Sequence, residues 1–293
     1  MRTTNNLDLP KPIVDAVSVR RDRGTAEFTV TELLSPPHQL RLLRKHDDEI
    51  VEDAADRIFA LLGQAVHAIL ERGSGALDGW LNPGDSCSAI KEKRLEMPIG
   101  GRVVSGALDH FALASGKLSD YKTASVWSVV FDHPEWEQQL NCYAHLLRHH
   151  GYNVRELEIV AILRDWSKRE ARRDSSYPHS QVVMIKYEPW SAEKAQAFME
   201  ERVRLHTAEI PPLCSSEERW EKKGKVAVKK PGVERAVRLF NTKAEAEAFR
   251  AADPKMRGTV LEERPGEFPR CESYCAAAFV CEFGRSLKEK ETP

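Results

Sequence analysis

The sequence lacks a strong net charge of either sign. Its 293 residues include 44 Lys and Arg and 45 Asp and Glu, which gives a formal net charge of -1. This balance argues against wholesale electrostatic binding of nucleic acid, although charge acts locally and a basic patch can still hold phosphate. Basic clusters occur at 38–46, 164–173 and 222–230. Each cluster taken alone is more typical of a solvated surface than of a binding patch.

Long apolar runs are missing as well. No segment approaches the ~20 apolar residues that a membrane helix needs, and residues 1–12 lack the apolar core of a signal peptide. We therefore expect a cytoplasmic protein with no membrane partner. The chain also has no internal repeat and no low-complexity tract, and its content of 41% hydrophobic and 30% charged residues is typical of a globular protein.

The order of the expected elements indicates a mixed α/β core. Residues 1–25 read as a polar arm, 26–210 as the core and 211–293 as an extension, because the composition changes after Pro211 and Pro212. The core is expected to contain, in order, a helix over 52–73 that stops at Gly73, a hairpin over 102–124, a helix over 132–151 capped by Asp132, strands over 154–166 and 180–190, and a helix over 191–209.

The hairpin carries the residues that most suggest chemistry. Side chains alternate along a strand, so Asp120 and Lys122 point to one face while Tyr121 points away. A turn at 114–117 brings Asp109 to within a residue or two of the position opposite Asp120. Two converging carboxylates repel each other unless a cation joins them. Hard oxygen ligands suit Mg²⁺ or Mn²⁺.

Lys122 beside such an ion could orient a water molecule or neutralise charge that develops on a phosphate. These residue types fit metal-assisted phosphodiester hydrolysis. The alternative is a surface hairpin with an ordinary cross-strand salt bridge. The tripeptide 120–122 alone favours this alternative, because such tripeptides are common.

Four motifs that occur together in one order favour phosphodiester hydrolysis over the ordinary salt bridge. GALD (106–109) and DYK (120–122) resemble the core of the PD-(D/E)XK nuclease superfamily. GQAVH (63–67) resembles the helix of its RecB-like, CRISPR-associated-exonuclease-like branch, and QLNCY (139–143) resembles the downstream helix of that branch. The resemblance covers about residues 30 to 210. It implies a restriction-endonuclease-like fold, in which a central mixed β-sheet is flanked by helices and the hairpin holds the metal.

The resemblance also implies a role for each motif residue. His67 would be a metal ligand, Asp109 the central carboxylate that bridges the metal ions, and Asp120 the second acidic ligand. Tyr121 would offer its backbone carbonyl to the ion. Lys122 would be the catalytic lysine.

Gln139 and Tyr143 would lie near the metal or the DNA backbone, and their spacing of four places them on one helical face. They could instead form a half-buried polar pair. His67 taken alone is more typical of a hydrogen-bonded core histidine. Glu92 and Glu96 lie on the approach to the first hairpin strand, and either could be a further acidic ligand.

The cysteines gather near the end of the sequence. Cys271, Cys275 and Cys281 form a C-x3-C-x5-C cluster, and Cys214 is the first choice for a fourth ligand. Thiolates are soft ligands that suit Zn²⁺ or an iron–sulfur cluster. In a reducing compartment disulfides are not expected.

Some nucleases of the resembled branch hold a [4Fe-4S] cluster with three C-terminal cysteines. Their first ligand precedes the motif histidine, whereas no cysteine precedes His67 here, and their C-x2-C spacing is C-x3-C in this chain. A [4Fe-4S] cluster, Zn²⁺ and no metal therefore stay open, in that order. Cys87 and Cys142 are expected to be unligated.

The sequence thus predicts a divalent-metal-dependent DNA exonuclease of recombination, repair or phage DNA processing. Lys and Arg side chains would hold the DNA backbone. Trp127, Trp136 and Trp166 could stack on bases, although each is more typical of a core or interface position. The alternatives are a non-catalytic DNA-binding or scaffold subunit of a recombination complex with a metal-stabilised tail, and a metal-dependent phosphatase. A recombination or annealing partner and a homo-oligomer also stay open.

Overall fold

The computed structural model describes residues 2–19, 24–72, 89–131 and 133–291, and it divides the chain into two compact units. The first unit comprises Met1–Arg41 and Asp47–Pro212, and the second comprises Leu42–His46 and Leu213–Pro293. The expected boundary between residues 210 and 211 lies two residues before this division. The expectations for Gly73, Cys87 and Asp132 fall outside the described residues.

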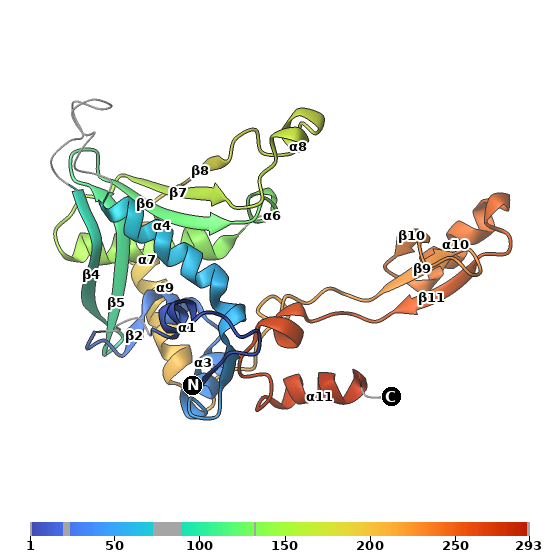
Figure 1. Ribbon diagram of the computed structural model, residues 1–293, viewed down its shortest axis with the longest axis horizontal. Helices are drawn as coiled ribbons and strands as arrows, with labels where there is room; N and C mark the ends of the chain where they lie inside the picture. Colours follow the sequence, from blue (N-terminus) through green and yellow to red (C-terminus); the bar gives the residue numbers. More distant parts are fainter. Residues whose placement is uncertain (1, 20–23, 73–88, 132, 292–293) are drawn as a thin grey trace. The chain divides into compact units, whose positions relative to one another are not determined.

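A mixed six-stranded sheet forms the centre of the first unit (Figure 1). Its strands are β2 (Phe28–Thr29), β4 (Ala89–Ile99), β5 (Arg102–Ala112), β6 (Lys117–Ala124), β7 (Glu156–Leu163) and β8 (Val182–Tyr187). The order is β2-β5-β6-β7-β8, and β4 also pairs with β5. The pairs β2–β5 and β6–β7 are parallel, whereas β4–β5, β5–β6 and β7–β8 are antiparallel.

Helices pack against this sheet. The longer ones are α4 (Ile58–Arg72), α7 (Pro134–His149) and α9 (Ala192–Thr207), and α2 (Val30–Leu34) packs beside them. The chain also forms the short helices α3 (Pro37–Lys45), α6 (Trp127–Val130) and α8 (Lys168–Arg173), of which α6 and α8 bury no residue. Helix α7 contributes buried Leu140, Leu146 and Leu147 to the core, where Leu157 and Ile159 of β7 are also buried. The predicted α/β class, with a central mixed sheet flanked by helices, is confirmed.

The close packing of α7 on β5 depends on a glycine. A Cβ atom on Gly106 would lie 2.7 Å from side-chain atoms of both Leu146 and Tyr143. Real Cβ atoms do not approach other atoms so closely, so any larger residue here would push α7 away from the sheet. The first residue of the GALD motif is therefore explained by packing.

The helix that carries His67 is shorter than expected. Residues 52–57 are not α-helical, because β3 (Val51–Asp53) and the 3₁₀ turn η1 (Ala54–Arg57) precede α4. The Asp53 carboxylate accepts a hydrogen bond from the Ala55 amide at 3.1 Å, which caps η1 and sets the start of the helix. The apolar spacing of α4 also does not mark a buried face, since Leu62 and Ile69 are 47% and 67% exposed.

The N-terminal segment belongs to the first unit. Strand β1 (Arg2–Thr4) pairs in parallel with β3, and α1 (Lys11–Ser18) buries Val17. Residues 2–4 and 11–18, which belong to the segment that the sequence suggested as a polar arm, thus form regular structure. Among the described residues, no helix combines the length and the apolar composition that crossing a bilayer requires.

The second unit contains a small antiparallel sheet with the order β10-β9-β11. Its elements are β9 (Lys225–Lys229), β10 (Ala236–Phe240), α10 (Lys243–Ala252), η2 (Pro254–Met256), β11 (Val260–Arg264), the π-helical turn η3 (Arg270–Tyr274) and α11 (Glu282–Glu291). Val226 and Val228 of β9 pack with Ala246 of α10 in a separate core. A capping box formed by Thr242 and Glu245 opens α10.

Candidate metal centre

The site lies where β5 and β6 separate. Their backbone pairing extends only from His110–Ser119 to Ala112–Lys117, at the turn end of the hairpin. Beyond it, the Tyr121 amide donates a hydrogen bond of 2.7 Å to Oδ2 of Asp109 instead of to a backbone carbonyl. The separation of the two strands thus turns the Asp109 carboxylate into the gap between them.

Helices α4 and α7 border this gap from opposite faces of the sheet. Thr123 points to the face of α4, where its hydroxyl lies near Gly63. Lys122 points to the other face and contacts Gln139 of α7. Because neighbouring side chains on a strand alternate, Tyr121 lies on the α4 side and Asp120 on the α7 side.

A second carboxylate faces Asp109 from β4. The register pairs Lys91 with His110 and Lys93 with Leu108, so Glu92 stands directly opposite Asp109. The Glu92 backbone has φ +43°, a left-handed conformation that is unusual for a residue with a side chain. Such a conformation costs about 1–3 kcal/mol and is concentrated at functional sites.

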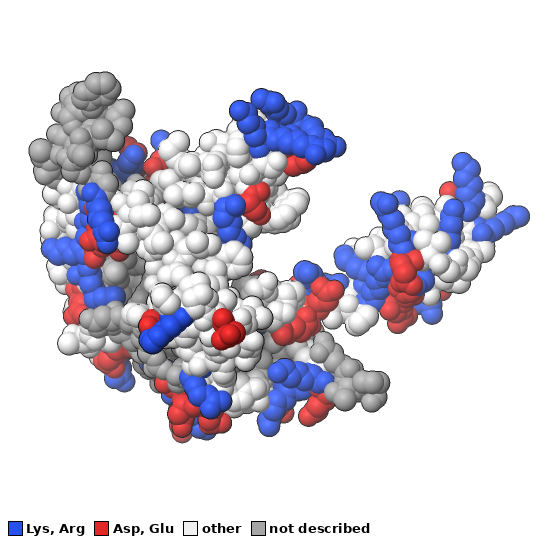
Figure 2. Space-filling model, in the orientation of Figure 1, with Lys and Arg blue, Asp and Glu red and all other residues white. Residues whose placement is uncertain are grey.

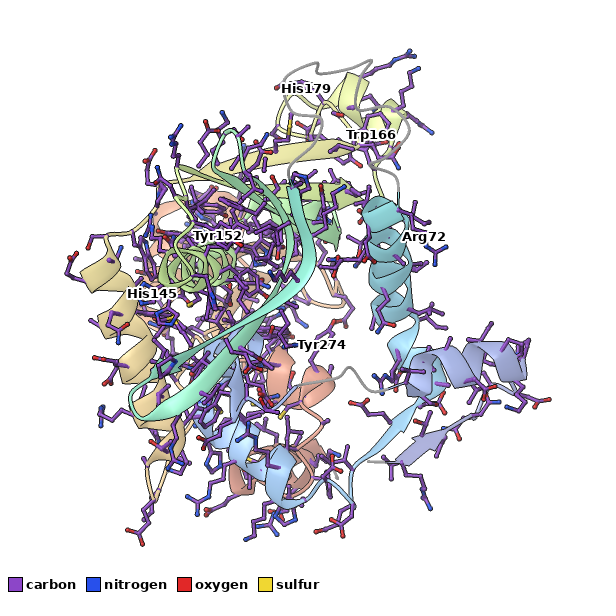
Figure 3. All side chains as sticks on the ribbon, turned by 90° about the vertical axis from the view of Figure 1, so that its left-hand side faces the viewer. Arg72, His145, Tyr152, Trp166, His179 and Tyr274 are labelled. Atoms are coloured by element: carbon purple, nitrogen blue, oxygen red, sulfur yellow. The ribbon has the colours of Figure 1, made fainter. Side chains whose placement is uncertain are left out.

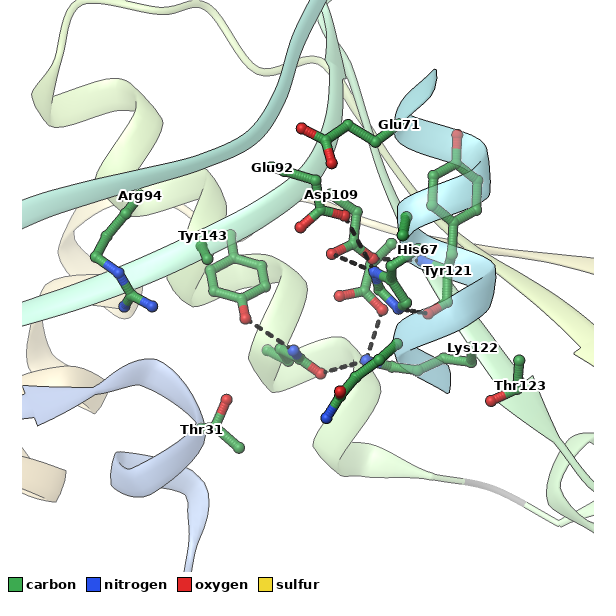
Figure 4. A pocket seen from close by; sticks show the side chains of 15 residues that line it. Thr31, His67, Glu71, Glu92, Arg94, Asp109, Tyr121, Lys122, Thr123 and Tyr143 are labelled. Atoms are coloured by element: carbon green, nitrogen blue, oxygen red, sulfur yellow. Dashed lines mark hydrogen bonds and ion pairs between the residues drawn. The ribbon is translucent and has the colours of Figure 1, made fainter. Parts of the chain in front are cut away.

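His67 joins the two carboxylates (Figure 4). Its Nδ1 lies 3.2 Å from Oε1 of Glu92 and 3.3 Å from Oδ1 of Asp109. Its Nε2 lies 3.1 Å from the backbone oxygen of Tyr121. The potential ligand atoms of His67, Glu92 and Asp109 all lie within 4.8 Å of one another, and no other such trio occurs in the described parts of the chain.

A hydrogen-bonded chain runs beside this trio. The Lys122 ammonium forms an ion pair of 2.6 Å with Asp120 and donates a hydrogen bond of 2.9 Å to Oε1 of Gln139. The Gln139 amide nitrogen in turn donates to the Tyr143 hydroxyl at 2.9 Å. Asp120 and Tyr143 are buried. This hydrogen-bonded series of side chains therefore fixes the position of the Lys122 ammonium beside His67, Glu92 and Asp109.

The pKa shifts reflect this concentration of negative charge. The hydrogen bond to Asp109 raises the pKa of His67 to about 9, against the opposing effect of burial. Burial raises the pKa of Asp120 to about 6, and the charge of Lys122 opposes that rise. Burial, followed by the charge of Asp109, also raises the pKa of Glu92. At neutral pH His67 is thus protonated, and its proton occupies a place among carboxylates that a divalent cation could take.

A pocket of about 620 Å³ opens over these groups. Its lining also includes Thr31, Gln64, Ala68, Glu71, Arg94 and Ala107 besides the residues described above. The pocket thus combines an acidic end around His67 with the cationic groups of Lys122 and Arg94. A phosphate group bound to a metal ion needs both kinds of neighbour.

The expected site residues do not all converge on one point. His67 and Asp109 meet, but the second carboxylate beside them is that of Glu92, whereas Asp120 is paired with Lys122. The Tyr121 carbonyl contacts the His67 ring.

Gln139 and Tyr143 support Lys122 and do not reach the trio. Glu96, the other acidic alternative, lies 3.4 Å from the Thr25 hydroxyl and does not line the pocket.

The four tail cysteines lie near one another in the second unit. Burial raises the pKa of Cys214 to about 11, and Glu218 and the thiols of Cys271, Cys275 and Cys281 add to the rise. All four are half-buried, and none is disulfide-bonded. Cys142 is buried in α7 of the first unit.

No protein-family model matches this chain, and no curated protein matches it. A solved structure entitled "Crystal structure of SSO0001" is similar to it, with 19% sequence identity and a TM-score of 0.43. The similarity covers 68% of this chain and 84% of that chain. At this TM-score the similarity carries no argument, so the functional conclusion depends on the site itself.

Proposed function

We propose that this chain is a divalent-metal-dependent deoxyribonuclease of the PD-(D/E)XK type, which acts as an exonuclease in DNA recombination, repair or phage DNA processing. The observation that carries the proposal is the convergence of His67, Glu92 and Asp109 beside Lys122 in one pocket. Three of these four residues belong to motifs that resemble the superfamily. The cytoplasm is the proposed location.

The ligand set fits Mg²⁺ or Mn²⁺. Two carboxylates provide the hard oxygen ligands that both ions accept, and the imidazole of His67 favours Mn²⁺ of the two. When bound, such an ion would lower the pKa of a water molecule and polarise a phosphate oxygen. Glu92 and Asp109 would hold it, and His67 would join them after losing its proton.

The remaining groups would act on the phosphodiester. Lys122 is held by Asp120 and Gln139, so its ammonium has a fixed direction toward the pocket. It would donate a hydrogen bond to a phosphate oxygen and offset the charge that develops during in-line attack. Asp120 would keep Lys122 in place. Gln139 and Tyr143 would act as positioning residues.

We further propose that Cys214, Cys271, Cys275 and Cys281 bind a structural metal group, with a [4Fe-4S] cluster preferred over Zn²⁺. Four thiols without disulfides fit either group. Iron and sulfide analysis and visible absorbance of the purified protein would test this.

End-labelled DNA incubated with Mg²⁺, Mn²⁺ or EDTA tests the nuclease proposal. We expect metal-dependent release of mononucleotides or short oligonucleotides with 5′-phosphate ends. DNA binding without cleavage under all metal conditions would support the scaffold subunit instead. Hydrolysis of phosphomonoesters without DNA cleavage would support a phosphatase. Adding a recombination or annealing protein to the assay would reveal a dependence on such a partner.

A further inference from the structure

The C-terminal ends of β6 and β7 are joined into one corner of the first unit. The Val126 amide donates a hydrogen bond of 2.7 Å to the Asp165 carboxylate, and the Arg164 amide donates one of 3.0 Å to the Ala124 carbonyl. The Arg164 guanidinium also lies 4.5 Å from the ring centroid of Phe59 on α4. Residues that follow β6 and β7 thus meet a residue of α4, the helix that also carries His67.

Large aromatic side chains are exposed at this corner. Trp127 and Phe131 are 63% and 65% exposed, and their rings stack with centroids 6.1 Å apart and planes at 22°. Phe59 is 62% exposed. In contrast, Trp136 and Trp166 pack against the hydrophobic core. Of the three tryptophans that could stack on bases, only Trp127 therefore presents its ring to solvent.

Basic side chains follow Asp165, the residue that is hydrogen-bonded to the amide just before Trp127. Arg164 is exposed, and so are four basic residues of α8: Lys168, Arg169, Arg172 and Arg173. Figure 2 shows this concentration of Lys and Arg over α8. Trp166 anchors the segment by donating a hydrogen bond of 2.8 Å to the Pro178 carbonyl, and Figure 3 shows Trp166 and His179 at this end of the sheet. The basic helix is thus fixed to the fold.

We propose that this corner binds an unpaired nucleic-acid strand, with bases stacked on Trp127 and Phe131 and phosphates held by Arg164 and α8. We call these residues, with Phe59, the stacking corner. Stacking on aromatic rings beside basic side chains is how proteins hold single strands without sequence preference. The inference rests on the proposed function, because it assigns the substrate of the same site.

The distance to the metal centre fits this assignment. Trp127 follows Lys122 by five residues, and five residues of extended chain span at most ~18 Å. A strand whose bases stack at the corner would therefore need only a few nucleotides to reach the pocket. A protein partner would also cover exposed aromatic rings, but the excess of positive charge in α8 favours a polyanion.

Binding of labelled oligothymidylate in EDTA tests the proposal without cleavage. We expect Trp127→Ala to weaken binding about tenfold, as the loss of one base stack predicts. Trp127→Phe should retain most of the affinity, because it keeps an aromatic ring. Met184→Ala, which removes another side chain that is 66% exposed, should change nothing. Arg172→Ala should make the slope of log K against log salt concentration less steep, by about 0.7 for each phosphate contact that is lost.

Hydrolysis of a small p-nitrophenyl phosphodiester separates this inference from the nuclease proposal. That substrate is too small to reach Trp127, so Trp127→Ala should hydrolyse it at the wild-type rate. Equal oligothymidylate binding by wild type and Trp127→Ala would overturn the stacking corner even if the protein cleaves DNA. Binding that depends on Trp127 in a protein that hydrolyses neither substrate would support the corner and refute the nuclease.

Discussion

Glu92 shows how the backbone prepares the site at the scale of single residues. Its left-handed conformation interrupts the pairing of β4 with β5 at the position opposite Asp109. The cost of about 1–3 kcal/mol and the repulsion between the two carboxylates both oppose folding in the absence of a cation. His67, protonated at neutral pH, offsets part of that repulsion in the metal-free protein.

Glu92→Gln should lower Mn²⁺ affinity at least tenfold, because it removes one of two anionic ligands while keeping the size of the side chain. Calorimetric titration with Mn²⁺ would measure the change. Glu96→Gln is the matched control, since Glu96 lies on the same strand outside the pocket. Equal losses in both variants would show that Glu92 has no special part in binding.

The stability of the metal-free protein should fall as the pH rises from 6.5 to about 9. His67 has a folded-state pKa of about 9 against an ordinary value of 6.5. Its contribution to stability is therefore fully present below pH 6.5 and is lost as the pH rises through 9. Thermal unfolding of wild type and His67→Gln in EDTA, measured across this pH range, would reveal this loss of stability.

The fall should be smaller in His67→Gln, and identical pH profiles for the two proteins would contradict the assigned pKa. Over the same range Mn²⁺ should bind wild type more tightly as the pH rises, because the ion and the proton compete for the imidazole.

At the scale of elements, the sequence predicted the hairpin and its flanking helices because their signals are local. Alternation and turn residues defined β5 and β6, and the spacing of Gln139 and Tyr143 placed both on one face of α7. The start of α4 was missed because Asp53 caps a 3₁₀ turn and not the α-helix itself.

The place of Glu92 could not be read from local signals. It depends on the register of β4 against β5, a long-range pairing across the Gly100–Gly101 turn. The exposure of α4 was likewise not predicted, since an apolar stripe on a helix is usually buried. Here part of that helix borders the pocket.

Two glycine substitutions test the packing of α4 and α7. Gly106→Ala should destabilise the protein by about 1–3 kcal/mol, because its Cβ would overlap Leu146 and Tyr143. It should also displace Tyr143, and with it the hydrogen bonds that run through Gln139 to Lys122.

Gly63→Ala is the matched control, because its Cβ would meet the Thr123 hydroxyl at an ordinary 3.4 Å. Denaturant unfolding should show Gly63→Ala to be as stable as wild type or more stable, since alanine favours a helix; the reverse ranking would refute this packing argument.

At the scale of the whole molecule, the two candidate metal sites belong to different units. His67, Glu92 and Asp109 all lie in the first unit, whereas the four cysteines lie in the second. Within the second unit, Cys214 is separated in sequence from Cys271 by β9, β10, α10 and β11. The two sites should therefore lose their metals independently.

Cys271→Ser in the full-length chain should remove the metal of the second unit and leave Mn²⁺ binding at the first unit within twofold of wild type. Metal analysis and Mn²⁺ titration of the same preparation would measure both. A parallel loss of Mn²⁺ affinity would show that the two sites depend on each other.

The most direct test of the proposed metal centre is cleavage of single- and double-stranded DNA, labelled at the 5′ or 3′ end, with Mn²⁺. Wild type should degrade the DNA, and Asp109→Asn and Lys122→Ala should each lose at least a hundredfold in rate while remaining folded. Wild-type rates in either variant, or cleavage that persists in EDTA, would contradict the assignment of this pocket as a metal-dependent nuclease centre.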